Sequence, residues 1–180
     1  MRIVGGKYRG KKLWTPQGKE VRPTSERARE AIFNILYSKL GGDYSKLSLL
    51  DIFCGTGAFG FEALSRGFNY VTFVDIDTIP VNKNAKLFAA EKERFNVIKA
   101  DAMRLPQAYR KYDMVFMDAP YAKGQTEQAL TQLLMQNWLG KQAVCIVEVR
   151  NDERFLLPEV FELLDERVYG LARVLFLRYC

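Results

Sequence analysis

The 180-residue sequence contains no histidine, only three cysteines and no long apolar segment. Without histidine, Ser-His and Cys-His catalysis and most zinc hydrolase sites are excluded, so carboxylates, lysine, tyrosine or water must handle protons. Cys54, Cys145 and Cys180 are scattered, so we expect reduced thiols and no metal site. No apolar run approaches the roughly 20 residues that span a membrane, and the first residues lack a signal-peptide pattern. We therefore expect a cytoplasmic protein that does not engage a membrane.

The composition is that of a globular protein, with 48% apolar and 27% charged residues, and the length favours a single hydrophobic core. The charge, however, is unevenly placed. Residues 1–46 hold 11 of the 27 Lys and Arg residues but only 4 of the 21 Asp and Glu residues, so their net charge is +7 against −1 for the remainder. A basic extension on a near-neutral domain is typical of nucleic-acid binding, although a merely solvated N-terminus is the alternative. Because Tyr8 and Trp14 are interleaved with the cations, we favour a nucleic-acid-facing extension at 1–46 and a separate core at 47–180.

The pattern of apolar residues predicts an α/β protein. Residues 2–14 indicate a short two-stranded ribbon, and a helix is expected from Thr24 or Ser25 to Leu40. Beyond it, strands alternate with helices, which predicts a doubly wound and mostly parallel sheet. We expect strands at 47–53, 70–74, 95–99, 113–117 and 143–149, helices at 58–66, 80–91 and 126–138, and a final antiparallel hairpin at 160–169 and 172–179.

A glycine loop joins the first predicted core strand to the next helix. Gly55, Gly57 and Gly60 match the dinucleotide-binding fingerprint, and Asp75 ends the following strand, where its carboxylate can bind both ribose hydroxyls. The pattern alone is compatible with NAD, FAD or S-adenosylmethionine, and also with a structural tight turn. The loop therefore indicates a nucleotide-like ligand without identifying it.

Two further acids favour S-adenosylmethionine. Asp51 lies inside the expected binding mouth, where a carboxylate would repel a pyrophosphate but can hold a cationic methionine amino group. After the third strand, Asp101 can accept from the adenine amino group, and the Ala102 amide can donate to the ring. A dehydrogenase is less well supported, because the second half of its fold is missing. The expected cofactor contacts are Asp51, Phe53, Cys54, Gly55, Thr56, Gly57, Ala58, Gly60, Asp75, Ile76, Asp101, Ala102 and Asp118.

The tetrapeptide Asp118-Ala119-Pro120-Tyr121 follows the apolar run at 113–117. It is therefore expected at the carboxyl end of a buried strand, where open α/β sheets bind their ligands. The Asp118 carboxylate and the Ala119 carbonyl can accept hydrogen bonds from an exocyclic amine, while Tyr121 stacks on the base that carries it. These four residues are the predicted catalytic group.

Together these motifs resemble the RsmD family of bacterial 16S ribosomal RNA (guanine-N2) methyltransferases. The resemblance covers nearly the whole chain, and its most specific parts are the opening at 3–13 and the Arg22-Pro23-Thr24 segment. It also includes residues 25–30, Phe33-Asn34, the glycine loop with residues 61–66, Glu148 and Tyr169-Gly170.

The resemblance implies a Rossmann-like class I methyltransferase with a seven-stranded sheet, which transfers a methyl group from S-adenosylmethionine to the N2 amine of a guanine. The implied partner is 16S ribosomal RNA or the 30S particle, and we expect a monomer. One position departs from the family pattern, because alanine at 119 replaces a proline. Alanine keeps the carbonyl that accepts the hydrogen bond, and Pro120 still biases it toward an extended backbone, so we expect activity to be retained.

RNA contacts are assigned to the basic N-terminal segment, at Lys7, Arg9, Lys11, Lys12, Arg22, Thr24, Arg27 and Arg29. Two other functions stay open at this stage. One is an adenine-N6 methyltransferase acting on RNA or DNA, since the same tetrapeptide serves any aromatic amine. The other is a non-catalytic RNA-binding or ribosome-assembly factor with the same fold, for which the alanine at 119 is the argument.

Overall fold

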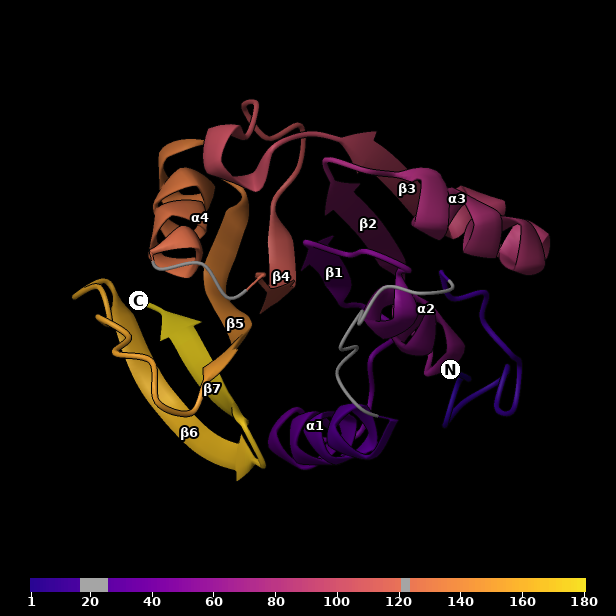
Figure 1. Cartoon of the computed structure of the whole chain (residues 1–180), viewed down its shortest axis with the longest axis horizontal. Coiled ribbons are helices and arrows are strands. Elements are labelled where there is room, and N and C mark those ends of the chain that lie inside the picture. The colour runs from indigo at the N-terminus through magenta and orange to yellow at the C-terminus, as the bar shows by residue number, and fades with distance from the viewer. Residues whose placement is uncertain (17–25, 121–123) are drawn as a thin grey trace.

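The computed structural model describes residues 1–16, 26–120 and 124–180, and its centre is a seven-stranded sheet (Figure 1). The strands are β1 (Ser48–Ile52), β2 (Tyr70–Asp75), β3 (Phe95–Lys99), β4 (Tyr112–Asp118), β5 (Leu139–Arg150), β6 (Phe161–Tyr169) and β7 (Ala172–Tyr179). The α-helices are α1 (Glu26–Lys39), α2 (Ala58–Ser65), α3 (Ile79–Ala85) and α4 (Gln125–Met135). Two 3-10 helices, η1 (Lys86–Arg94) and η2 (Ala102–Arg104), complete the elements.

The strand order is β3-β2-β1-β4-β5-β7-β6, and β7 runs antiparallel to both of its neighbours. The predicted doubly wound sheet with an antiparallel C-terminal hairpin is therefore confirmed. The hairpin inserts its second strand next to β5, which leaves β6 at the edge. The expected helix at 80–91 is wrong in its second half, because the backbone departs from helical geometry at Phe88 (φ −117°, ψ 31°). The sequence also missed η2.

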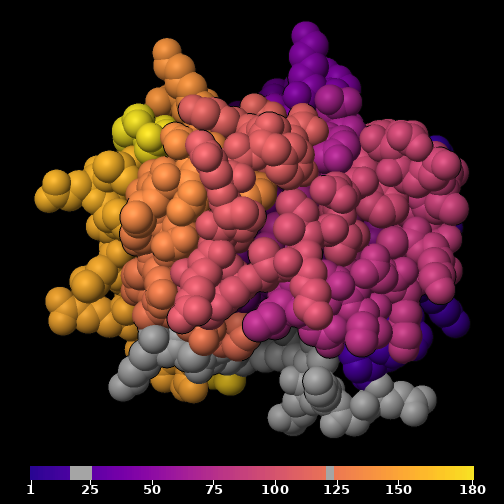
Figure 2. Space-filling view, turned by 90° about the horizontal axis from the view of Figure 1, so that it is seen from above, coloured from indigo at the N-terminus to yellow at the C-terminus, as the bar shows by residue number. Residues whose placement is uncertain are grey.

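The two faces of the sheet carry separate hydrophobic clusters, because successive strand residues point to opposite sides. On one face, Leu49 and Phe116 pack with apolar residues of α1 and α2. On the other face, Leu50 and Val115 pack with α4 and with Trp138, which is fully buried. Seen from above, the segment between β3 and β4 lies between the α4 side and the α3–η1 side (Figure 2). In the described part of the chain, no helix has the length and apolarity needed to cross a membrane.

The N-terminal ribbon, which we define as residues 1–14, is less regular than expected. A single bridge pairs Arg2 with Lys12, and backbone hydrogen bonds run from Ile3 N to the Lys11 carbonyl (2.9 Å) and from Leu13 N to the Met1 carbonyl (3.0 Å). Ile3 and Leu13 are buried in the same cluster as α1 and α2. The ribbon is therefore packed onto the core by its own apolar residues.

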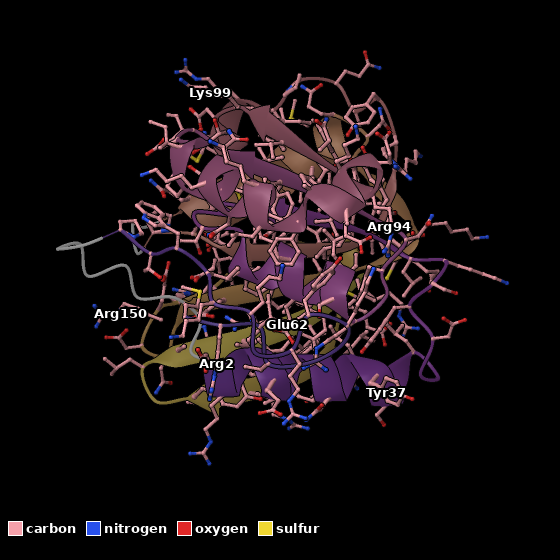
Figure 3. All side chains as sticks on the ribbon, turned by 90° about the vertical axis from the view of Figure 1, so that its right-hand side faces the viewer. Arg2, Tyr37, Glu62, Arg94, Lys99 and Arg150 are labelled. Carbon is pink, nitrogen blue, oxygen red and sulfur yellow. The ribbon has the colours of Figure 1, made fainter. Side chains whose placement is uncertain are left out.

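A buried carboxylate joins the ribbon to both nearby helices. Glu62 of α2 is fully buried and accepts hydrogen bonds from Val4 N (2.8 Å) and Arg66 Nε (2.7 Å). It also forms an ion pair with Arg29 of α1 (Nε to Oε2, 3.4 Å). Figure 3 shows Glu62 in the middle of this side, with Arg2 near one end of α1 and Tyr37 near the other. One side chain thus fixes three segments.

A second buried carboxylate, Glu91 of η1, holds the middle of the ribbon. It accepts hydrogen bonds from Lys7 Nζ (2.7 Å), Tyr8 Oη (2.6 Å) and Arg94 Nη1 (2.6 Å). The hydrogen bonds from Lys7 and Tyr8, and then Arg94, lower the pKa of Glu91 to about 2 although burial opposes the shift. The folded protein therefore favours the ionised carboxylate.

We expect Glu91→Gln to lower the free energy of unfolding by about 1–2 kcal/mol at pH 7. The effect is limited because Lys7 is largely exposed, so solvent screens its ion pair with Glu91. A depressed pKa contributes stability above the unfolded-state value and loses it as the pH falls toward the folded value. The difference from the native protein should therefore shrink as the pH falls below 4.5 toward 2. Urea denaturation at a series of pH values measures it. The exposed Glu93→Gln is the control and should show almost no effect. A difference that persists unchanged to pH 2 would contradict this role.

Candidate active site

The glycine loop leaves the carboxyl end of β1 with a backbone that few residues tolerate. Gly55 and Gly57 have φ values of 51° and 75°, in the left-handed region that favours glycine. A Cβ at Gly55 would meet no atom within 4 Å, so the loop faces open space there. At Gly60, in contrast, a Cβ would lie 2.3 Å from a ring carbon of Phe73, so α2 packs directly on the sheet. The loop therefore packs closely on the sheet at Gly60 and leaves open space for a ligand beside Gly55.

Asp75 at the end of β2 holds this loop in place. Its Oδ2 accepts a hydrogen bond from Gly55 N (2.8 Å), and its Oδ1 accepts one from Asp77 N (2.9 Å). A carboxylate offers about four lone-pair sites, so it retains acceptor capacity beyond these two bonds. The neighbouring Ile76 is 68% exposed, although it is a large apolar residue. This arrangement suits a ribose on the carboxylate and a flat apolar ring against Ile76.

Asp51 lies beneath the loop and is almost completely buried. Its Oδ2 accepts a hydrogen bond from Gly60 N (2.9 Å). Burial raises the pKa of Asp51 to about 8, and the Gly60 hydrogen bond opposes this shift while the nearby charge of Asp75 adds to it. Burial therefore favours the protonated carboxyl, and a cation placed beside it would favour the ionised form.

Asp101 is the third acid of the predicted cofactor site. Its Oδ1 accepts a hydrogen bond from Met103 N (2.9 Å) at the start of η2, and Ala102 is buried beside it. The Ala100 amide donates to the Asp75 carbonyl (3.1 Å), which ties this corner to the end of β2. Asp75 and Asp101 therefore lie at or just after the carboxyl ends of the neighbouring strands β2 and β3, and Asp51 is buried beneath the loop that follows β1. Acids in these positions would suit a cationic nucleoside better than a pyrophosphate.

Asp118 is the last residue of β4 and lies directly next to the predicted cofactor site. Met117 pairs with Ile52 of β1, so Asp118 is level with the residue that starts the glycine loop. On its other side Asp118 pairs with the buried Glu148 of β5. Ala119 is buried and Pro120 exposed, whereas Tyr121 is outside the described residues. The structure thus brings the first part of the tetrapeptide beside the glycine loop.

The two internal cysteines are not poised as nucleophiles. Burial, and then the charges of Asp51 and Asp75, raises the pKa of the Cys54 thiol well above its ordinary value. Burial alone raises the pKa of Cys145 to about 12. Both side chains belong to the hydrophobic clusters. Covalent catalysis through a thiolate is therefore disfavoured.

The predicted RNA contacts differ in whether their side chains are free to reach a ligand. The prediction for Arg29 is wrong, because its side chain is 1% exposed and is bound to Glu62. Lys7 is bound to Glu91, and Lys11 donates to the Leu87 carbonyl (2.7 Å) between aromatic rings, so both ammonium groups anchor the ribbon. Within the described residues, the side chains of Arg9, Lys12 and Arg27 are exposed and have no polar partner. Arg22 and Thr24 are outside the described residues.

Asn84 of α3 is a site residue that the sequence analysis missed. It is fully buried, and its Oδ1 accepts from Trp14 N (2.7 Å) while its Nδ2 donates to the Trp14 carbonyl (3.1 Å). The same Nδ2 donates to the Thr56 carbonyl in the glycine loop (2.9 Å). One amide therefore connects the end of the basic ribbon to the cofactor loop.

A signal for this residue exists in the sequence. Val81, Asn84, Phe88 and Glu91 recur at helical spacing and are all buried, so two polar residues share an apolar helix face. Buried polar groups need partners, and both of these residues find them in the ribbon. Polar residues at apolar positions would thus have identified the contact.

The strand order, the antiparallel β7 and the glycine loop after β1 define a class I, Rossmann-like methyltransferase that uses S-adenosylmethionine as its methyl donor. The family described as "Conserved hypothetical protein 95" matches residues 1–178. The chain belongs to this family, which is that of the ribosomal RNA small subunit methyltransferase D proteins.

Individual relatives are similar to this chain along almost its full length. The chain is 35% identical to ribosomal RNA small subunit methyltransferase D of Haemophilus influenzae over 96% of this chain and 90% of that protein. It is 33% identical to the Escherichia coli protein of the same name over 94% of this chain and 85% of that protein. Among solved structures, a putative methyltransferase from Escherichia coli has a TM-score of 0.84 and 31% identity, covering 99% of this chain and 97% of that one.

Substitution of Asp51 should weaken cofactor binding without weakening the fold. Asp51→Asn keeps the oxygen that accepts from Gly60, and it removes a carboxyl whose raised pKa costs stability as the pH rises from 3.8 toward 8. The variant should therefore fold at least as stably as the native protein at pH 7 but bind S-adenosylmethionine roughly tenfold or more weakly.

Calorimetry of S-adenosylmethionine binding, in buffers with different ionisation enthalpies, gives the second readout. The native protein should release a proton on binding at pH 7, because the cationic amino group favours the ionised form of Asp51. The Asn variant should lack this release. Equal affinity and equal proton release in the two proteins would rule out Asp51 as the partner of the amino group.

Proposed function

We propose that this protein transfers a methyl group from S-adenosylmethionine to the exocyclic N2 amine of a guanine in 16S ribosomal RNA. The observation that carries the proposal is the position of Asp118 and Ala119, at the end of β4 and beside the glycine loop. The full-length similarity to ribosomal RNA small subunit methyltransferase D supports the choice of substrate. We further propose that it acts as a monomer in the cytoplasm.

The cofactor contacts follow from the geometry of the mouth. Asp75 accepts from the ribose hydroxyls, Asp51 holds the amino group, and Asp101 with the Ala102 amide reads the adenine. The exposed Ile76 covers the adenine ring, and the open side of Gly55 lets the backbone approach the ligand. The remaining loop residues, Phe53, Cys54, Thr56, Gly57, Ala58 and Gly60, shape this surface. When bound, S-adenosylmethionine supplies an electrophilic methyl group on a sulfonium centre.

Asp118, at the end of β4, and Ala119 after it activate the target amine. The lone pair of the guanine N2 is delocalised into the ring, which makes the nitrogen a poor nucleophile. When the Asp118 carboxylate and the Ala119 carbonyl accept its two N–H groups, the nitrogen moves toward tetrahedral geometry and its lone pair is aimed. The same oxygens stabilise the positive charge that develops on nitrogen, an effect that dominates in many enzymes. We propose that Pro120 restricts this backbone and that Tyr121 stacks on the base.

The function is tested by product analysis. The protein is incubated with labelled S-adenosylmethionine and either free 16S RNA or 30S particles, and the RNA is digested to nucleosides. The expected product is N2-methylguanosine. Labelled N6-methyladenosine would instead favour the adenine-specific alternative, and no transfer to either substrate would favour a binding factor without activity.

Substitution of Asp118 tests the catalytic role. Asp118→Ala should lower kcat by about 100-fold or more, because an oxygen that stabilises the transition state is lost. Affinity for S-adenosylhomocysteine should stay within a few-fold, because the acid acts mainly on the target amine. Single-turnover methylation and calorimetry measure the two effects. Ala119→Pro, which keeps the carbonyl and stiffens the backbone, should preserve or raise the rate. An Asp118→Ala protein with the native rate would refute the mechanism.

The exposed cations of the N-terminal segment generate a separate prediction. Each phosphate contact to single-stranded RNA contributes about 0.7 to the slope of log affinity against log salt. The Lys12→Ala/Arg27→Ala protein should therefore bind RNA more weakly and show a slope smaller by about 1.4. A filter-binding salt titration measures it.

The matched control for this titration is Lys111→Ala/Lys141→Ala. Both of these lysines are exposed and lie near the starts of β4 and β5, at the amino ends of these parallel strands. The control protein should keep the native slope. If the two double variants behave alike, the RNA surface is elsewhere.

A further inference from the structure

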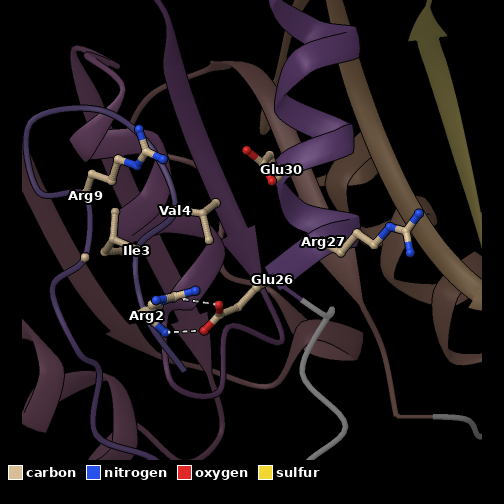
Figure 4. Close-up of a pocket in the computed structure, with 8 residues that line it drawn as sticks. Arg2, Ile3, Val4, Arg9, Glu26, Arg27 and Glu30 are labelled. Carbon is tan, nitrogen blue, oxygen red and sulfur yellow. Dashed lines mark hydrogen bonds and ion pairs between the residues drawn. The ribbon is translucent and has the colours of Figure 1, made fainter.

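A polar cavity of about 270 Å³ lies between the ribbon and the first turns of α1 (Figure 4). It is separate from the mouth formed by the glycine loop and the end of β4. Its walls are charged, with Arg2 and Arg9 from the ribbon and Glu26, Arg27 and Glu30 from α1. The lining residues are Arg2, Ile3, Val4, Arg9, Gly10, Glu26, Arg27 and Glu30.

The charged groups of this cavity fall into a fixed pair and two available side chains. Arg2 donates from its backbone N (2.8 Å) and its Nε (3.0 Å) to Glu26, which closes one end. Arg9 reaches in from the ribbon, and Glu30 extends toward it from α1, whereas the head group of Arg27 points away (Figure 4). Within the described residues, neither Arg9 nor Glu30 has a side-chain hydrogen bond or ion pair. The cavity thus offers one unused guanidinium and one unused carboxylate.

The unused guanidinium and the unused carboxylate decide which chemical groups the cavity can bind. A free phosphate would face the carboxylates of Glu26 and Glu30, which repel it. A neutral planar group with donors on one edge and acceptors on another matches both walls. Unpaired RNA bases are recognised in this way, by hydrogen bonds to their exposed edges.

Among the bases, guanine fits best. Its N1–H and N2–H groups are adjacent donors that match the two oxygens of one carboxylate. Adenine and cytosine present an acceptor next to their amino group, and uracil presents only one donor. On the other edge, O6 and N7 of guanine accept from an arginine, which is the commonest specific contact to this base.

The cavity lies close enough to the mouth to serve the same RNA strand. Arg2 follows Met1, whose Sδ accepts a hydrogen bond from Thr56 Oγ1 of the glycine loop (3.8 Å). We infer that this cavity binds a second, unpaired guanine of the substrate RNA, with Glu30 on its N1–H and N2–H edge and Arg9 on O6 and N7. The inference rests on the proposed function and adds a base-reading site that positions the RNA beside the target.

Photo-crosslinking tests the location and the base together. The protein, loaded with S-adenosylhomocysteine, is irradiated with 16S RNA that contains sparse 6-thioguanosine, free or assembled into particles, whichever form is methylated. Mass spectrometry then maps the adducts. Thioguanosine should form adducts both near Pro120 and within residues 1–12 or 26–39. The same RNA with 4-thiouridine should not label the cavity residues Arg9 and Glu30, although uridines beside the proposed phosphate contacts Lys12 and Arg27 can react.

Two variants sharpen the result. Glu30→Gln should reduce the adduct at the cavity roughly tenfold, since one bidentate contact is lost, and leave the adduct near Pro120 intact. The Glu30 side chain is exposed and unpaired within the described residues, so its replacement should leave the fold intact. Glu93→Gln is the matched control. Normal adducts near Pro120 without any at the cavity, or cavity adducts that Glu30→Gln leaves unchanged, would overturn the inference. Absence of both adducts together with absence of methyl transfer would instead refute the proposed function, and the cavity inference with it.

Discussion

The buried carboxylate of Glu62 is the interaction on which the N-terminal half of the structure depends. It binds the Val4 amide and the guanidinium groups of Arg29 and Arg66, so the ribbon, α1 and α2 meet at one charge. Burial lowers the pKa of Arg29, while the charge of Glu62 opposes that shift. Among the described residues, Nη1 of Arg29 is buried without a hydrogen-bond partner. Loss of one member of such a pair costs about 3–5 kcal/mol, because the other charge stays buried.

This arrangement places the ribbon, which carries the proposed RNA contacts, next to the glycine loop. The ribbon is fixed to α2 by Glu62, to η1 by Glu91 and to α3 by Asn84. Both the charged cavity beside α1 and the glycine loop therefore share walls with the same short segment. The sheet supplies the acids, and the ribbon supplies the exposed cations.

The sequence predicted those parts of the molecule that depend on local order along the chain. Alternating apolar segments identified the strands, and Gly55, Asp75 and Asp118 were expected at one end of the sheet because each lies at or shortly after the end of a strand. The sequence pattern does not reveal an environment that residues distant in sequence decide. Arg29 was expected on the surface because it is a charged residue near a helix start, but Glu62, 33 positions away, draws it into the core. Likewise, the kink at Phe88 arises in a segment that packs against the ribbon, which helical periodicity alone does not reveal.

The Asn84 contact also has an evolutionary consequence. Its amide binds only main-chain atoms of Trp14 and Thr56, and every residue type provides a carbonyl. Positions 14 and 56 are therefore free to drift independently without breaking the link, except that proline at 14 would remove its donor. Position 84, by contrast, must offer a donor and an acceptor together on a short side chain. Across relatives, an invariant asparagine between two variable partners would be the mark of this contact, with no covariation among the three positions.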